Sequence, residues 1–318
     1  MVHFKSMKPG ELWLPEHATH ASILLEDPLR ASPLLVRAMH ASRFERFFFA
    51  SEYQGGIPVG CIHVDYSRLQ HVRMAFLGDE KMLEAFLPCL EPSEPCIIQY
   101  IPIHLVGFFE NHLHVNPTVE YRYLEWVPSR AESFPDAPDM AISFTGFRNL
   151  PVDSIVKFYA FPVTSRTLAL LDGFDGLVLQ ESGNGGNMPN ASTTGSMRER
   201  AVGNGKEHGN GNEPRSIIAS VYDNFSKLPV KVQEAVIAGV KVAKKFRNRG
   251  YCKLLLQRFL QHLLARDCPR VGLFVHDVND TAIKCYESVG FVERARYFRC
   301  ILGGNDQVPG DESLSHAL

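Results

Sequence analysis

The stretch KKFRNRGYCKLL, residues 244–255, decides how this chain is interpreted. Basic residues run up to Gly250, and a leucine-rich run starts directly after it. An apolar segment, residues 235–243, precedes the stretch and is typical of a buried strand. The pattern fits a solvated strand end followed by a core helix. It also fits a helix N-terminus that holds phosphate, so neighbouring sequence has to decide between them.

A helix over residues 250–266 is predicted by apolar side chains at helical spacing, namely Leu256, Phe259, Leu260, Leu263 and Leu264. The first turn of such a helix has free backbone N–H groups, and its dipole attracts an anion. Gly250 lets the backbone approach a phosphate oxygen closely, because glycine has no side chain. The basic residues before it would add positive charge.

Composition limits the possible partners and compartments. The 318 residues suffice for two domains, and a formal net charge of -2 gives no overall attraction to nucleic acid or membrane. We see neither a secretory signal nor an apolar stretch of the ~20 residues that a membrane span needs. The seven cysteines form no Cys-x-x-Cys pair and are typical of a reduced, intracellular protein. We expect a cytoplasmic or nuclear protein that binds no metal.

The second half of the chain alternates strand and helix patterns. Strands are predicted at residues 141–147, 176–180, 216–222, 235–243, 271–275 and 291–302, and helices at 153–161, 164–171, 250–266 and 279–289. Residues 182–215 contain almost no large apolar groups, so we expect a disordered insert between two strands. Residues 304–318 are predicted to form a flexible tail.

The first half repeats this order more faintly. Strands are predicted at residues 46–51, 59–65, 71–76, 96–101 and 120–127, and helices at 32–41, 80–87 and 106–112. The repetition indicates a diverged duplicate. We therefore predict an α/β (α+β) protein with an N-terminal domain at residues 1–127, a linker at 128–139 and a second domain at 140–303.

A second motif follows Gly250. Asn279 opens NDTAIKCYESVGF, which places Asn279, Ala282, Tyr286, Gly290 and Phe291 at fixed intervals. With the stretch around Gly250, it resembles the GCN5-related N-acetyltransferase (GNAT) superfamily, whose members carry R/Q-x-x-G-x-G/A and then N-x-x-A-x-x-x-Y-x-x-x-G-F. The resemblance is clear over residues 230–296 and extends over 140–302. It is closest to the glycine N-acyltransferase-like branch, which also carries a degenerate first copy.

The resemblance implies a mixed central sheet, two tandem copies of it, and acetyl-CoA or another acyl-CoA as cosubstrate. The backbone of six residues would grip the pyrophosphate of coenzyme A: Arg247, Asn248, Arg249, Gly250, Tyr251 and Cys252. Val240 and Val242 would line the pantetheine, and Asn279 would contact the cofactor arm. Tyr286 would protonate the departing thiolate. Cys252 stands where the family usually has Gly or Ala, and both Cys252 and Tyr286 are also compatible with core packing.

The chemistry needs a base, because an amine attacks a thioester only when it is neutral. The strand positions facing the acceptor hold Val236 and Ala238, which cannot accept a proton. The nearest candidates are Glu234, two residues earlier, and His276, at the end of the next strand. A backbone N–H on the central strand could stabilise the oxyanion.

We therefore predict an N-acyltransferase, most simply an N-acetyltransferase, that acts on an amine of a small molecule or a protein. One alternative is transfer of a larger acyl group to a free amino acid. Another is a catalytically silent relative that binds coenzyme A or a protein partner. The equivalent turn of the first half reads FLGDEKML, with acids where phosphate should lie, so we expect no cofactor there. The oligomeric state stays open.

Overall fold

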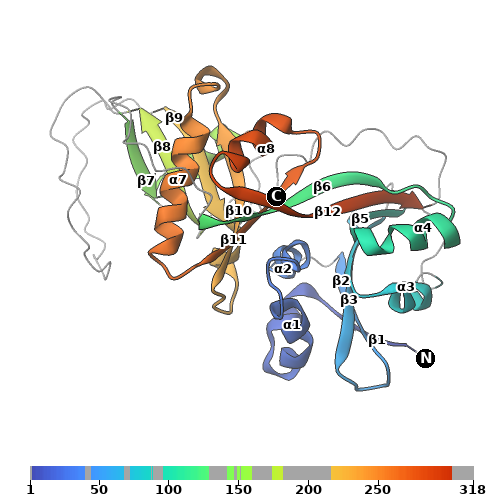
Figure 1. The fold of residues 1–318 in the computed structure, drawn as a ribbon. Helices are drawn as coiled ribbons and strands as arrows, with labels where there is room; N and C mark the ends of the chain where they lie inside the picture. Colours follow the sequence, from blue (N-terminus) through green and yellow to red (C-terminus); the bar gives the residue numbers. More distant parts are fainter. Residues whose placement is uncertain are drawn as a thin grey trace.

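The structure is a computed structural model. It describes residues 2–39, 44–67, 72–86, 88, 96–128, 142–146, 149–150, 152–159, 174–181 and 216–302. A single sheet of twelve strands runs through these residues, and helices pack on both of its faces (Figure 1). The predicted insert, the helix at 164–171, the predicted tail and almost all of the linker lie outside the described residues.

The described residues of the first half form six strands and four α-helices. They are β1 (His3–Met7), α1 (Ala18–Leu25), α2 (Ser32–Ala38), β2 (Glu45–Ser51), β3 (Pro58–Asp65), β4 (Val72–Leu77), α3 (Glu80–Phe86), β5 (Cys96–Pro102), α4 (Val106–His112) and β6 (Thr118–Trp126). The sequence predicts all of these except β1 and α1. The short, mixed segment HFKSM of β1 carries no clear alternation of apolar and polar residues.

The described residues of the second half form six more strands. Its elements are β7 (Ile142–Gly146), α5 (Val152–Tyr159), β8 (Asp175–Glu181), β9 (Ile217–Asp223), β10 (Glu234–Val242), α7 (Tyr251–Leu264), β11 (Arg270–His276), α8 (Asp280–Glu287) and β12 (Phe291–Leu302). Every one of them was predicted, with bounds that differ by a few residues. The most regular patterns, those of β10 and α7, are the ones that fix the candidate site.

The two halves follow the same plan along the sheet. In the first half, β1 to β4 pair antiparallel in sequence, and β5 joins β4 in parallel. In the second half, β7 to β10 pair antiparallel in sequence, and β11 joins β10 in parallel. The predicted mixed sheet and its two copies are therefore confirmed.

The last strands of the two halves are exchanged at the centre of the sheet. β12 lies between β5 and β6, and β6 lies between β12 and β11 (Figure 1). Trp126 on β6 donates its Nε1 hydrogen to the Val289 carbonyl at 3.1 Å. Arg122 on the same strand donates from Nε to Asp277 Oδ1 at 2.6 Å. Each half therefore completes its sheet with a strand from the other.

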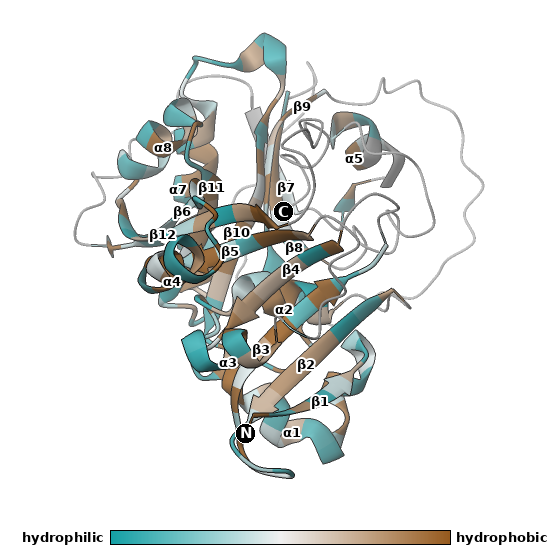
Figure 2. Cartoon of the chain, turned by 90° about the vertical axis from the view of Figure 1, so that its right-hand side faces the viewer, coloured by the Kyte–Doolittle hydropathy of each residue, from teal (hydrophilic) through white to brown (hydrophobic). Residues whose placement is uncertain are grey.

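Apolar strands form the centre of the molecule, and the helices enclose them (Figure 2). On one face, α7 and α8 bury a cluster that includes Leu255, Phe259 and Tyr286. α1 and α2 cover the opposite face, where one cluster joins residues of both halves, including Tyr123, Val236 and Tyr297. Burying each large side chain contributes roughly 1.5–3 kcal/mol, so this shared core couples the stability of the two halves.

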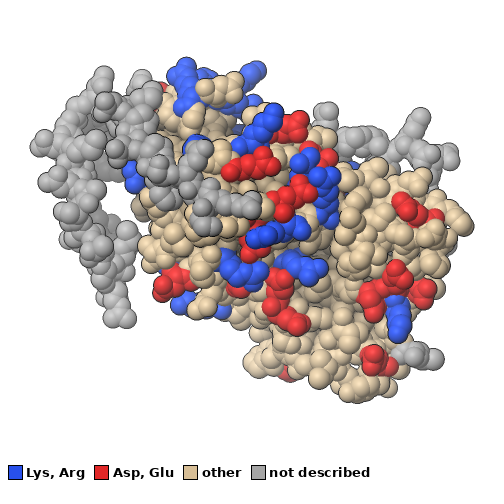
Figure 3. Space-filling view, viewed as in Figure 1, with Lys and Arg blue, Asp and Glu red and all other residues tan. Residues whose placement is uncertain are grey.

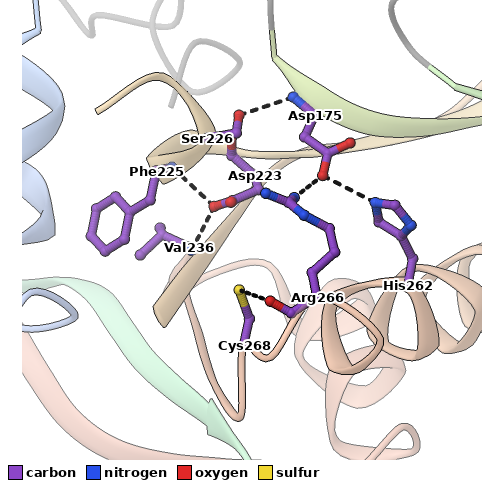
Figure 4. Close-up of polar contacts among 8 residues, drawn as sticks. All are labelled: Asp175, Asp223, Phe225, Ser226, Val236, His262, Arg266 and Cys268. Carbon is purple, nitrogen blue, oxygen red and sulfur yellow. Dashed lines mark hydrogen bonds and ion pairs between the residues drawn. The ribbon is translucent and has the colours of Figure 1, made fainter. Parts of the chain in front are cut away.

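A buried carboxylate organises the turn that leads into β10 (Figure 4). Asp223 Oδ1 accepts hydrogen bonds from the backbone N–H groups of Phe225 at 2.9 Å and Val236 at 3.0 Å. Beside it, Asp175 accepts hydrogen bonds from His262 and Arg266 near the end of α7. Burial raises the pKa of Asp223 to about 7, against the effect of the two backbone donors.

Candidate active site

The candidate site begins where β10 and β11 separate. Their parallel pairing runs from Glu234 opposite Arg270 to Ile237 opposite Leu273, whereas the strands continue to Val242 and His276. We use the term fork for the two strand ends that do not pair with each other, residues 238–242 and 274–276. On its other side, β10 pairs with β9, but the register shifts between Ala238 and Lys241. This β-bulge frees backbone groups beside the fork.

A basic loop and the start of α7 follow the fork. Gly250 is the N-cap of α7 in the left-handed region, at φ 77°, and no side chain caps the helix. A Cβ atom at Gly250 would meet nothing within 4 Å. Lys244, Lys245, Arg247 and Arg249 are all exposed. Figure 3 shows Lys and Arg gathered at this end of the molecule. The loop therefore offers a helix N-terminus without a side-chain cap, positive charge and open space.

Arg247 and Val242 tie this loop to the fork. The Nε of Arg247 donates a hydrogen bond to the Val242 carbonyl at 3.2 Å. Val240 and Val242 are partly buried and pack at the edge of the core beneath α7. The structure thus brings the predicted pantetheine and pyrophosphate residues together along one path, from β10 to the first turn of α7.

Asn279 and Tyr286 lie at the two ends of α8. The side-chain oxygen of Asn279 caps the helix by accepting a hydrogen bond from Ala282 N at 3.2 Å, and its amide nitrogen is left for other contacts. Tyr286 is 8% exposed, and its ring lies 6.0 Å from that of Phe291. Burial, followed by the nearby thiols of Cys252 and Cys285, raises the pKa of the phenol. Tyr286 therefore stays protonated at neutral pH.

The unusual Cys252 has a partner. Its thiol is hydrogen-bonded to that of Cys285 on α8, and both residues pack against the core under α7. This hydrogen bond, followed by burial, raises the pKa of Cys252. The same bond lowers the pKa of Cys285. Cys252 thus contributes a packed thiol on the inner side of the first turn, while the backbone of that turn faces the open loop.

The structure separates the two candidate bases. Glu234 lies at the start of β10, where its Oε1 is 3.4 Å from Arg270 NH1. Six residues of extended strand, roughly 20 Å, separate it from Val240. His276 is the last residue of β11 and lies three residues beyond Leu273, where the pairing with β10 ends. Only His276 of this pair is brought to the fork.

The surroundings of His276 keep it neutral. Its ring lies 5.0 Å from that of Tyr121 on β6, and its Nδ1 is buried with no hydrogen-bond partner among the described residues. Burial and then Arg299 lower its pKa, while Asp277 opposes them. Its neighbour Val275 packs under α7, so His276 faces the opposite side of the sheet. Val236 and Ala238 face that same side.

In the first half, the helix that follows the corresponding fork is capped by a side chain. Pairing of β4 with β5 ends at Ala75 opposite Gln99. The carboxylate of Asp79 caps α3 by accepting from Met82 N at 3.1 Å. A Cβ atom at Gly78 would lie 2.6 Å from Met82 Cε, so this side chain fills the turn. A cavity of about 820 Å³ opens nearby, lined among others by Leu77, Tyr100 and Arg270.

Gly239 lies in the fork but belongs to neither sequence motif. Gly239 adopts φ 60° within the β10 bulge. A glycine inside a strand pattern often marks a bulge, so AVIAGVKVA held a signal that could have been used. Its contacts come from Tyr159 on α5 and from Ser220 on β9. No local pattern links Gly239 with a helix 80 residues earlier.

Sequence comparisons agree with this geometry. Residues 212–291 match the model of the Acetyltransferase (GNAT) family. Over 70 residues, the chain is 36% identical to N-alpha-acetyltransferase 30 from Xenopus laevis, a region that covers 22% of this chain and 26% of that protein. Over 46 residues, 14% of this chain, it is 37% identical to an acetyltransferase from Yersinia enterocolitica, 33% of which is covered. The chain thus spans between a quarter and a third of the length of these relatives.

Solved structures extend the likeness to the whole fold. A tandem GNAT protein from the clavulanic acid biosynthesis pathway is similar with a TM-score of 0.58 at 11% identity, over 96% of this chain and 100% of that one. A GCN5-related N-acetyltransferase from Sphaerobacter thermophilus gives 0.55 at 14%, over 96% and 98%. At these identities the likeness concerns the fold alone. Residues 212–291 thus match the GNAT family model within a chain that has the GNAT fold in two copies.

Two further observations concern partners. Among the described residues, no helix combines the length and the apolar character needed to cross a bilayer. In the same part of the chain, no three His, Cys, Asp or Glu side chains are grouped so that they could hold a metal ion.

Proposed function

We propose that the chain is an N-acyltransferase that moves an acyl group, most simply acetyl, from coenzyme A to a primary amine at the β10–β11 fork. The observation that carries this proposal is the continuity of the fork with an uncapped, basic α7 N-terminus. The backbone N–H groups of the first turn would hold the pyrophosphate, and Gly250 would let it approach the backbone. The pantetheine would then lie along Val240 and Val242.

His276 is the proposed general base. The amine must lose a proton when its nitrogen bonds to the acyl carbon, and a neutral imidazole can accept it directly or through a water. His276 ends β11 at the fork, and its lowered pKa keeps it neutral at pH 7. Glu234 is less suited to this role, because it lies at the far end of β10 against Arg270.

Tyr286 is the proposed donor to the leaving sulfur. When the tetrahedral intermediate collapses, the C–S bond breaks, and the thiolate takes a hydrogen bond or a proton from the phenol. Burial beside Cys252 and Cys285 keeps the phenol protonated. The same raised pKa makes complete transfer less favourable, so we expect hydrogen bonding to the thiolate to supply most of the effect.

The acceptor class can be narrowed by the relatives. The matched region is similar to N-alpha-acetyltransferase 30, whose name specifies an α-amino group. We therefore propose peptides with a free α-amino group as the first acceptors to test, with lysine side chains and small amines as further arms. The transfer chemistry is the same for each, and only the fit to the acceptor side differs.

The test combines binding and turnover. Purified protein is titrated with acetyl-CoA and then assayed against α-amino peptides, Nα-blocked lysine peptides and small amines. Transfer to one class, reduced roughly 10-fold to 100-fold in Tyr286→Phe with acetyl-CoA affinity unchanged, supports the proposal. Binding without transfer in any arm would favour the catalytically silent relative. Absence of acetyl-CoA binding would contradict the proposal outright.

A further inference from the structure

The bulge in β10 leaves one peptide carbonyl outside the regular ladder, and a buried side-chain pair binds it. The hydroxyl of Tyr159 on α5 donates to the Gly239 carbonyl at 2.5 Å. Ser220 Oγ on β9 lies 2.5 Å from the same hydroxyl and 3.5 Å from the carbonyl. Since the single phenolic proton goes to Gly239, Ser220 donates to the Tyr159 oxygen. The Gly239 carbonyl is thus held by a two-member chain of donors.

The packing around Gly239 makes this contact specific. A Cβ atom there would lie 2.0 Å from a ring carbon of Tyr222 and 2.8 Å from the Tyr159 oxygen. Gly239 also has φ 60°, which most residues adopt at a cost. Tyr159 is 5% exposed and Ser220 is 1% exposed. The two rings and the glycine therefore define a single orientation of this peptide in a dry environment.

The orientation of the carbonyl fixes that of the next N–H. In a planar trans peptide, the C=O of Gly239 and the N–H of Val240 point in opposite directions. The carbonyl points toward β9 and α5, because its partners come from those elements. The N–H of Val240 therefore points away from β9, toward the fork. β11 does not pair with β10 at this level, since their ladder ends at Ile237.

We propose that Tyr159, assisted by Ser220, is a positioning residue for acyl transfer. It fixes the Gly239–Val240 peptide so that the Val240 N–H donates to the acyl carbonyl oxygen. This inference rests on the function proposed above. As the amine nitrogen bonds to the acyl carbon, the carbonyl electron pair moves to oxygen, and the amine proton goes to His276. The C–S bond then breaks, and the thiolate takes its hydrogen bond or proton from Tyr286.

A fixed donor has a clear advantage here. An N–H that already points at the developing oxyanion needs no reorganisation during the reaction, and loss of such a donor costs roughly 10²–10³ in rate. Without Tyr159, the Gly239 carbonyl would lose its partner in a buried setting and the peptide would be free to rotate. The donor would then be displaced rather than removed, so we expect a smaller loss, of roughly 10-fold.

The test compares two tyrosines of one cluster. Tyr159→Phe removes the bond to Gly239, whereas Tyr222→Phe removes a hydroxyl from the same buried cluster and leaves that bond intact. We expect kcat to fall roughly 10-fold in Tyr159→Phe, with KM for the amine unchanged. The ratio of the acetyl-CoA to the coenzyme A Kd should rise about 5-fold, the equivalent of one hydrogen bond, because coenzyme A has no acyl carbonyl. Tyr222→Phe should change neither quantity.

Other outcomes are decisive as well. Equal effects of the two variants on Tm, with wild-type kcat and Kd ratio in both, would make Tyr159 a merely structural residue and overturn the inference. If Tyr159→Phe does not fold, Ser220→Ala tests the same chain of donors and should lower kcat roughly 2-fold to 5-fold. A wild type that binds no acyl-CoA removes the proposed function, and the inference with it. An active wild type with an insensitive Tyr159→Phe removes the inference alone.

Discussion

The two halves share one topology and differ at the helix that follows the fork. In the first half, the carboxylate of Asp79 caps α3, and Met82 fills the turn against Gly78. In the second, α7 begins at Gly250 with no side-chain cap and with open space beside it. An anion site needs free N–H groups. A capping carboxylate occupies these N–H groups, and its negative charge repels the anion. The same sheet topology thus occurs in this chain with a capped helix after one fork and an uncapped helix after the other.

The comparison also shows where the halves depend on each other. Each fork is formed by strands of its own half. By contrast, β12 of the second half lies between β5 and β6 of the first half. The cluster under α1 and α2 includes Val236 from the second half. A change in one half should therefore alter the stability of both, while ligand binding should depend on one alone. Four predictions follow this distinction, from the largest effect to the smallest.

The largest effect should come from removal of β12. A chain that ends at Gly290 exposes the edges of β5 and β6 and removes the buried apolar side chains of β12, including Phe291, Tyr297 and Cys300. We expect loss of the cooperative unfolding transition in both halves, measured by circular dichroism and calorimetry. A chain that ends at Leu302 is the matched control and should unfold like the full chain. A first half that stays folded without β12 would show that the halves are independent.

The next effect concerns coenzyme A and the α7 N-terminus. Gly250→Asp places a negative charge near the expected phosphate, and repulsion at about 5 Å is worth about 3 kcal/mol, or roughly 100-fold in Kd. Gly250→Asn is the control, because asparagine has the same shape, tolerates φ > 0 and carries no charge. Calorimetric titration of the wild type should give one site per chain. Two equivalent sites would contradict the contrast drawn between α3 and α7.

A pH profile tests the base. The pKa of His276 is lowered by burial and Arg299, so the neutral form should predominate down to a pH below its ordinary value of about 6.5. kcat/KM should then fall as pH decreases through that lowered pKa. His276→Ala should reduce kcat roughly 100-fold and remove this limb, whereas Glu234→Gln should leave it in place. If the acidic limb of the kcat/KM profile shifts only in Glu234→Gln, Glu234 is the base and His276 is not.

Much of this architecture was accessible from the sequence. The regular apolar patterns predicted β10 and α7, and the motif around Asn279 predicted α8 and its cap. The exchange of β6 and β12 was not predictable, because a strand pattern has the same form whichever neighbour it pairs with. Of the two candidate bases, spacing along the chain favoured Glu234 and His276 equally. Only the strand register placed Glu234 at the start of the β10–β11 pairing and His276 beyond its end.

The last prediction uses a pair of aspartates at equivalent positions, Asp65 at the end of β3 and Asp223 at the end of β9. Each carboxylate accepts from a backbone N–H two residues later, that of Ser67 at 2.8 Å and that of Phe225 at 2.9 Å. Burial raises the pKa of Asp223 to about 7. Burial acts the same way on Asp65, but the two hydrogen bonds from Ser67, with Arg37, outweigh it and lower the pKa.

The signs of the two pH effects are therefore opposite. Between about pH 4 and 7, native Asp223 keeps a proton that the unfolded chain has lost, so its contribution to stability declines as pH rises. Asp65 stabilises the fold at pH values above the pKa that it has in the unfolded chain. This stabilisation is lost as the pH falls through the lower pKa of the native state. At pH 8, Asp223→Asn should raise the free energy of unfolding by about 1–3 kcal/mol and Asp65→Asn should lower it. Urea titrations at pH 5 and 8 measure both. A loss of stability at pH 8 in Asp223→Asn would show that its two backbone bonds outweigh the burial of charge.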